Sequence, residues 1–120
     1  MSFVDCINRR DVDGLGRLMA EDHTLKVFDE APLAGRHANI AAWRGYAGAF
    51  PHYRIYPDQV SEDEDRVAVL GHTTGSHLGL PDDEERRMTL IWVAEVVDGA
   101  LRSWTLVEDS LESRERLGLH

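Results

Sequence analysis

The sequence predicts an α+β fold, in which helices pack on one face of a curved antiparallel sheet. Two observations support this class. Segments with helical spacing of apolar residues dominate the first half of the chain, whereas β-rich segments separated by turn residues fill the second half. With 120 residues the chain has the size of one domain around one core, so residues 1–120 are expected to form a single domain.

Three helices are expected before the run of strands. Apolar residues recur at helical spacing within Ser2–Arg9, and Asp11 can cap a second short helix over residues 12–19. The main helix covers His37–Phe50, where apolar residues recur at steps of three and four until Pro51 ends the run.

Strand signals are short and regularly punctuated. Residues 23–29 form a first strand, which the turn residues 30–35 stop. At least three consecutive antiparallel strands follow, and the last two are joined by Asp98 and Gly99, the dipeptide most typical of a two-residue hairpin. The tail is expected to add a last helical turn or two, whose apolar contacts are Leu111 and Leu117.

The strand within residues 88–97 is apolar on both faces. A strand with one solvated face would alternate, so a second subunit is expected to cover the far face of the sheet and make a homodimer. Glu95 interrupts one of these faces, and a buried carboxylate needs a reason. Its partner is an arginine across the sheet or the dimer interface, or else Glu95 belongs to a pocket in which it acts as an acid.

Composition excludes several classes of protein. The net charge of -9, with acidic runs at residues 61–65 and 81–85, would repel phosphate backbones, so no nucleic-acid partner is expected. No apolar stretch is long enough to span a bilayer and the first residues lack a signal-peptide core, so a cytoplasmic protein without a membrane partner is expected. The single cysteine, Cys6, lies at an apolar helix position and is expected to be buried and unreactive.

Two side chains suggest acid-base chemistry. Glu108 shares one strand face with Trp104, so it either marks where the strand reaches solvent or is a proton-transferring carboxylate at the rim of an apolar cavity. His77 lies between Gly75 and Gly79, and it either makes ordinary hydrogen bonds or transfers protons and orients a substrate oxygen. The flanking glycines favour a bulge or a close approach of a ligand.

The three tryptophans, with Tyr46, Tyr53 and Phe50, predict an apolar small-molecule pocket between the main helix and the sheet. The residues expected to bind a substrate there are Trp43, Tyr46, Phe50, Trp92, Trp104 and His72. The six histidines show no metal-site spacing, and glycine-rich phosphate loops and nucleophile motifs are absent from the sequence. No metal and no cofactor are therefore expected.

Two stretches, Ile7–Leu25 and Gly35–Ile55, resemble the opening of the nuclear transport factor 2-like superfamily, which also contains ketosteroid isomerase, and most closely its SnoaL-like polyketide cyclase branch. The segment "GSHLG" is similar to the "GTHxG" of that branch, and Trp104 with Glu108 matches its late tryptophan and acid. The resemblance implies a cone-shaped, cystatin-like α+β barrel, usually dimeric, whose helices pack on the concave face of the curved sheet and enclose an apolar pocket. It further implies an aldol ring closure in which Glu108 and His77 serve as the acid-base pair.

The resemblance has departures. The acid of the branch is usually aspartate, and here it is Glu108. The catalytic positions of ketosteroid isomerase correspond to Phe3, Val27 and Trp92, so isomerase chemistry of that type is not expected. The expected function is a cofactor-independent acid-base enzyme of cyclase, isomerase or hydrolase type, acting on an apolar oxygenated molecule. The alternative is a non-catalytic ligand-binding or dimeric interaction module of the same fold.

Overall fold

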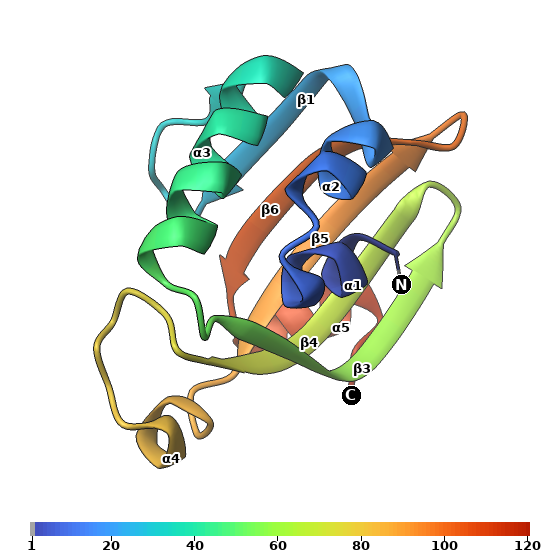
Figure 1. The fold of residues 1–120 in the computed structure, drawn as a ribbon. Coiled ribbons are helices and arrows are strands. Elements are labelled where there is room, and N and C mark those ends of the chain that lie inside the picture. The colour runs from blue at the N-terminus through green and yellow to red at the C-terminus, as the bar shows by residue number, and fades with distance from the viewer. Residues whose placement is uncertain (1) are drawn as a thin grey trace.

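A curved six-stranded sheet forms the centre of the computed structural model, which describes residues 2–120 (Figure 1). The strand order is β2-β1-β6-β5-β4-β3. Helices α1, α2 and α3 lie on one side of the sheet and α5 lies behind it (Figure 1). In chain order the elements are α1 (Ser2–Arg9), α2 (Val12–Leu18), β1 (Met19–Val27), β2 (Leu33–Ala34), α3 (Arg36–Ala49), β3 (Arg54–Asp63), β4 (Arg66–Thr74), α4 (Asp82–Glu85), β5 (Leu90–Val97), β6 (Ala100–Glu108) and α5 (Leu111–Leu117).

Local sequence signals position α1 and α2 as predicted. The Asp11 carboxylate caps α2 by accepting a hydrogen bond of 2.9 Å from the Gly14 N–H. β1 begins at Met19, earlier than predicted, because α2 passes directly into the strand. The pairing of β1 with β6 is irregular between Met19 and Thr24, which explains why this part of the sequence lacks a strand pattern.

The sheet is antiparallel except for one pair of strands. β1 runs parallel to β6, with Leu25 opposite Trp104, and the long stretch of chain between them provides the crossover that a parallel pair needs. The predicted hairpin between β5 and β6 is confirmed. Asp98 and Gly99 both have positive φ, 52° and 78°, as its two-residue turn requires.

The chain's own C-terminus covers part of the convex face. Leu117 and Leu119 are buried there against Leu70 and Ile91. The predicted contact of Leu111 is wrong, because this side chain is 74% exposed. Part of the apolar far face of β5 is therefore covered without a second subunit, and the homodimer stays a prediction.

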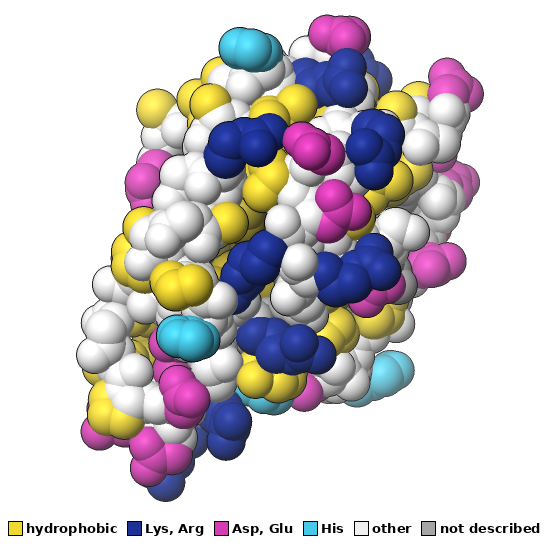
Figure 2. Space-filling model, in the orientation of Figure 1, with side chains coloured by type: hydrophobic (Ala, Val, Ile, Leu, Met, Phe, Trp, Pro, Cys, Tyr) yellow, Lys and Arg dark blue, Asp and Glu magenta, His cyan; other side chains and the backbone are white. Residues whose placement is uncertain are grey.

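Arginines gather over the face on which the helices lie (Figure 2). Two of them are paired with acids across elements, Arg36 with Glu21 and Arg44 with Asp13, each at 3.1 Å. These pairs are largely solvent-exposed, so they contribute little to stability.

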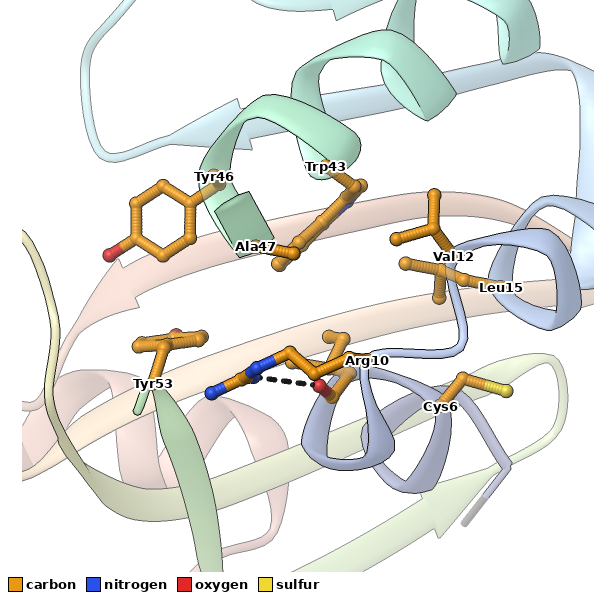
Figure 3. Close-up of a pocket in the computed structure, with 9 residues that line it drawn as sticks. Cys6, Arg10, Val12, Leu15, Trp43, Tyr46, Ala47 and Tyr53 are labelled. Carbon is orange, nitrogen blue, oxygen red and sulfur yellow. Dashed lines mark hydrogen bonds between the residues drawn. The ribbon is translucent and has the colours of Figure 1, made fainter. Parts of the chain in front are cut away.

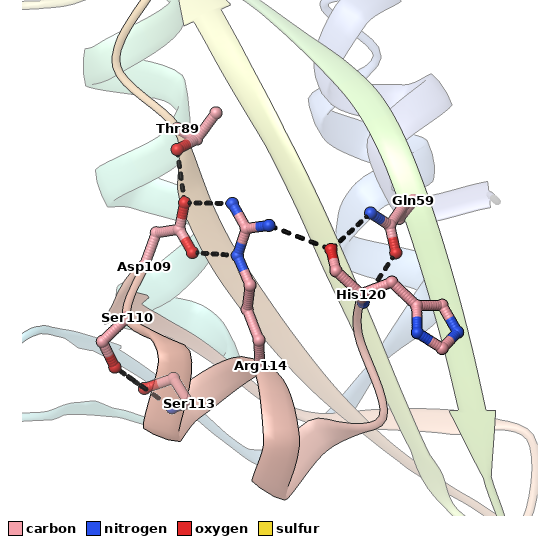
Figure 4. A network of polar contacts seen from close by, with 7 residues as sticks. All are labelled: Gln59, Thr89, Asp109, Ser110, Ser113, Arg114 and His120. Carbon is pink, nitrogen blue, oxygen red and sulfur yellow. Dashed lines mark hydrogen bonds and ion pairs between the residues drawn. The ribbon is translucent and has the colours of Figure 1, made fainter.

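A polar network ties α5 and the C-terminus to the sheet (Figure 4). Arg114 donates to the Asp109 carboxylate from Nε at 2.6 Å and from Nη2 at 2.8 Å, and the Thr89 hydroxyl donates to the same carboxylate. Arg114 Nη1 and Gln59 Nε2 both donate to the His120 carbonyl oxygen, each at 2.9 Å. The end of β6, α5 and β3 are thus held by one connected set of hydrogen bonds.

We predict that Asp109→Asn lowers the melting temperature near neutral pH by several degrees. Hydrogen bonds from Arg114 lower the pKa of Asp109 from 3.8 to about 2. A carboxyl with a lowered folded-state pKa contributes stability above its unfolded pKa and loses it as the pH falls through its folded pKa. Thermal denaturation at a series of pH values should therefore show that the difference in melting temperature between Asp109→Asn and wild type disappears between about pH 4 and pH 2. A difference that stays constant over this range, or an equal effect of the exposed Asp29→Asn, would contradict the assignment.

Candidate functional site

An apolar cavity of about 190 Å³ lies between α3 and the concave face of the sheet. It is lined from β1, α3, β5 and β6, from the turn before β3 and from the loop after β4, by Leu25, Val27, Ala42, Trp43, Tyr46, Tyr53, His77, Trp92, Trp104 and Leu106. All three tryptophans of the chain are among these residues. Among residues 2–120, lysine, arginine, aspartate and glutamate do not line the cavity, so its chemistry suits an uncharged molecule.

Strand alternation sends the large side chains of β6 into this space. Trp104 and Leu106 share the concave face, opposite the β5 residue Trp92. Trp104 is only 2% exposed, and its ring lies 4.5 Å from the Phe3 ring and 6.4 Å from the Trp92 ring. These aromatic rings form a packed wall of the cavity, positioned by both the sheet and α1.

A hydrogen-bonded pair, Tyr46 and His77, supplies the polar part of the lining. The backbone N–H of His77 donates to the Tyr46 hydroxyl at 3.2 Å, and the same hydroxyl lies 2.9 Å from His77 Nδ1. In the tautomer in which the Tyr46 hydroxyl donates its own proton to Nδ1, the imidazole proton lies on Nε2. His77 then presents an N–H donor and keeps its ring orientation fixed by α3.

The loop that carries His77 is anchored by a buried acid that sequence analysis missed. Glu85, at the end of α4, is 1% exposed and accepts a hydrogen bond of 2.5 Å from the Thr73 hydroxyl. Its other oxygen lies 3.4 Å from the Ser76 nitrogen, next to His77. In the sequence Glu85 is part of the acidic run at residues 81–85. Only its burial and its contact with Thr73 in the folded chain distinguish it from its exposed neighbours.

The glycine signal around His77 has a backbone origin. Gly75 and Gly79 both have positive φ, 70° and 68°. A Cβ at Gly75 would lie 2.5 Å from the His52 carbonyl oxygen, so this glycine allows two backbone segments to approach each other. The close approach predicted for a ligand is made here by the turn before β3.

Four predicted site residues line the cavity together with His77. These are Trp43, Tyr46, Trp92 and Trp104. Phe50 does not line it, because α3 ends at Ala49 and the Phe50 ring lies beside Tyr46, at 4.6 Å. His72 lies outside it, stacked on Tyr56 and 2.9 Å from Asp58 Oδ2.

The two predicted catalytic residues, Glu108 and His77, do not line one cavity. Glu108 is exposed and, together with Phe28 and Asp29, lines an adjoining hollow. Leu106 lines both this hollow and the cavity. Its catalytic role stays a prediction. Glu95 is also exposed, on β5, and is not part of the cavity lining.

A second, much smaller space lies between α3 and the helices α1 and α2 (Figure 3). It measures about 10 Å³, which is at most the room needed by one water molecule. Arg10 lines this space and donates to the Ile7 carbonyl oxygen at 3.1 Å and to the Pro51 carbonyl oxygen at 2.6 Å. This space is too small for a ligand, and the aromatic-lined cavity between α3 and the sheet is the candidate site.

A family model described as a SnoaL-like domain matches residues 2–104. The chain belongs to the SnoaL-like family. This confirms the family predicted from the sequence, and its α+β architecture agrees with that prediction. A search of curated proteins found no match to this SnoaL-like chain.

Solved structures share the fold of the SnoaL-like chain at low sequence identity. A Sinorhizobium meliloti protein with a provisional polyketide cyclase assignment has 22% identity and a TM-score of 0.73, over 88% of this chain and 89% of the other. A Mycobacterium tuberculosis epoxide hydrolase has 15% identity and a TM-score of 0.71, over 97% and 79%. A cystatin-fold protein from Novosphingobium aromaticivorans has 14% identity and a TM-score of 0.76, over 89% and 92%. At these identities the similarity shows the fold alone.

Residues 2–120 also bear on metal binding and on membrane insertion. Among these residues, histidine, cysteine, aspartate and glutamate form no group of three or more that could hold a metal ion. Within the same part of the chain, every helix is too short or too polar to cross a membrane.

Proposed function

We propose that the SnoaL-like chain binds a small, uncharged, largely apolar molecule that carries oxygen, in the cavity between α3 and the sheet. The observation that carries this proposal is the lining, in which three tryptophans and aliphatic side chains surround one fixed polar pair, Tyr46 and His77. Aromatic walls bind apolar rings, and a few placed polar groups fix a ligand's orientation.

A pair of neighbouring alanines on α3 tests whether the cavity is the binding site. Ala41 and Ala42 are both exposed, but only Ala42 lines the cavity. With indanone as the probe, Ala42→Phe should weaken binding at least tenfold because the new ring occupies the cavity, whereas Ala41→Phe should bind as wild type does. Ligand-observed NMR titration measures both. Equal affinities of the two variants would contradict the location, and absence of binding to wild type would contradict the function.

The second candidate function is acid-base catalysis on the bound molecule, which the fixed Tyr46–His77 pair favours. His77 Nε2 can donate to a substrate carbonyl and polarise it, while a carboxylate removes a proton from the neighbouring carbon. Glu108 is the proposed carboxylate, since it follows Leu106 on the same face of β6 and borders the adjoining hollow. Cyclase and epoxide hydrolase names among the structural neighbours support small-molecule chemistry for this fold.

Cyclisation of acetonylacetone to methylcyclopentenone tests this second candidate. A proton leaves the carbon beside one carbonyl, that carbon forms a bond to the other carbonyl carbon, and one water molecule is lost. We predict that His77→Gln and Glu108→Gln each reduce turnover at least a hundredfold, whereas His72→Gln leaves it unchanged. NMR detection of the product measures the rate. Turnover retained in Glu108→Gln would exclude Glu108 from the chemistry, and no turnover by wild type would leave binding alone as the proposal.

A further inference from the structure

Tyr53 places an unused hydroxyl group beside the apolar cavity. The residue follows α3, and its ring packs edge-on against the Tyr46 ring at 5.0 Å while lining the cavity. Among residues 2–120, no side chain or backbone group makes a hydrogen bond with the Tyr53 hydroxyl. In contrast, the Tyr46 hydroxyl is fully engaged by His77.

The position of this hydroxyl follows from what surrounds it. Side-chain atoms that are sealed off within the described chain and lack a partner are His23 Nε2, Asn39 Oδ1 and Trp43 Nε1, and the Tyr53 hydroxyl is not one of them. It therefore borders open space although protein surrounds most of it. Tyr53 lines both the large cavity and the space of about 10 Å³ beside Arg10, and of these two only the large cavity, at about 190 Å³, has room for a ligand.

Tyr53 remains a proton donor at all ordinary pH values. Burial raises the pKa of Tyr53 well above its usual value, and the nearby Tyr46 and Glu85 raise it further, against a smaller opposing effect of Arg10. A neutral phenol in an apolar site that lacks a partner loses the hydrogen bond it would make to water. A ligand oxygen that accepts from the hydroxyl would restore that bond.

We infer that the Tyr53 hydroxyl is the hydrogen-bonding subsite of the cavity and binds a carbonyl oxygen of an uncharged ligand. This inference rests on the proposed binding function and adds the group that selects for oxygen. Among the described residues, aspartate and glutamate do not line the cavity, which disfavours amines because no carboxylate there would neutralise their charge. The apolar body of the ligand would lie against Trp92, Trp104 and Leu106.

The test compares indanone with indane, which differ by the carbonyl oxygen. Tyr53→Phe removes only the hydroxyl, and Tyr56→Phe is the matched control because the Tyr56 hydroxyl bonds Thr74 away from the cavity. Ligand-observed NMR titration should show that Tyr53→Phe weakens indanone binding about fivefold, the effect of one hydrogen bond, and leaves indane binding unchanged. Tyr56→Phe should leave both affinities at their wild-type values.

Three outcomes would overturn the inference. If Tyr53→Phe weakens both probes equally, Tyr53 only shapes the cavity, and if it weakens neither, its hydroxyl makes no contact. In both cases the proposed binding function stands. If wild type binds neither probe, the inference and the binding function fail together.

Infrared spectroscopy of bound indanone provides a second measurement that does not depend on affinity. The carbonyl stretch should lie at lower wavenumber in wild type than in an apolar solvent, and it should stay there in His77→Gln. This comparison needs no Tyr53 variant, so it decides the question even if Tyr53→Phe fails to fold. An unshifted stretch in wild type, or a shift that disappears with His77→Gln, would contradict the assignment to Tyr53.

Discussion

Replacing Trp104 with alanine is expected to lower the free energy of unfolding by about 3–5 kcal/mol, the cost typical of removing a large buried aromatic side chain. Trp104 is 2% exposed and packs against both Phe3 and Trp92. It lines the cavity on one side and borders a second hollow, near α1, on the other. Its loss would therefore join two existing spaces and leave little chance for the surroundings to close over the gap.

Urea denaturation followed by circular dichroism measures this effect. Trp104→Phe is the matched control, because it keeps an aromatic ring on the wall and should cost less than half as much. Indanone binding to Trp104→Ala should also weaken, since one wall of the cavity is gone. A loss below about 1 kcal/mol for Trp104→Ala would show that the wall is not the packed centre of this core.

Replacing Glu85 with alanine is expected to be the second large perturbation. The Glu85 carboxylate accepts from the Thr73 hydroxyl and lies within reach of the Ser76 N–H, and an orphaned buried donor costs about 1–3 kcal/mol. Removal of this acceptor should also loosen the loop after β4. Amide hydrogen exchange at His77 should therefore accelerate along with the loss of stability.

The neighbouring acid Glu84 provides the control for charge. Glu84→Ala removes the same negative charge from the same helix, but Glu84 is exposed, so its stability should change by less than about 0.5 kcal/mol. Glu85→Gln keeps one oxygen acceptor and should fall between wild type and Glu85→Ala. Equal effects of Glu84→Ala and Glu85→Ala would mean that net charge, and not the buried contacts, determines the result.

Elements with strong local signals were predictable from the sequence. The Asp11 cap determined where α2 begins, and the Asp98–Gly99 turn determined the register of β5 with β6. The start of β1 was not predictable, because its irregular pairing with β6 depends on a strand that follows much later in the chain. The packing of Leu119 on the convex face, with Leu111 left exposed, likewise depends on how the end of the chain is tied down.

The candidate site was predictable in its aromatic part. Helical spacing placed Trp43 and Tyr46 on the face of α3 that meets the sheet, and strand alternation placed Trp92 and Trp104 opposite them. The alternation of side chains along a strand predicts which face of the sheet a residue lies on. It does not predict how far the helix that covers this face extends along the strand. Glu108 therefore shares a face with Trp104 and still borders a different hollow.

Buried polar groups were the least predictable part. Glu85 and its exposed neighbours are indistinguishable in an acidic run, and only the packing of α4 against β4 buries one of them. Tyr53 is half-buried at a turn, where no periodic pattern indicates which way its hydroxyl points. Such positions depend on contacts between segments, which local spacing does not encode.

The three tryptophan indole N–H signals offer the most direct test of the central claim, that the cavity between α3 and the sheet binds a small uncharged molecule. All three tryptophans of the chain line this cavity. Proton–nitrogen correlation spectra recorded during titration with indanone should show the signals of Trp43, Trp92 and Trp104 shifting together to saturation with one dissociation constant. Indole signals that stay unchanged while indanone binds would place the ligand elsewhere and contradict the account.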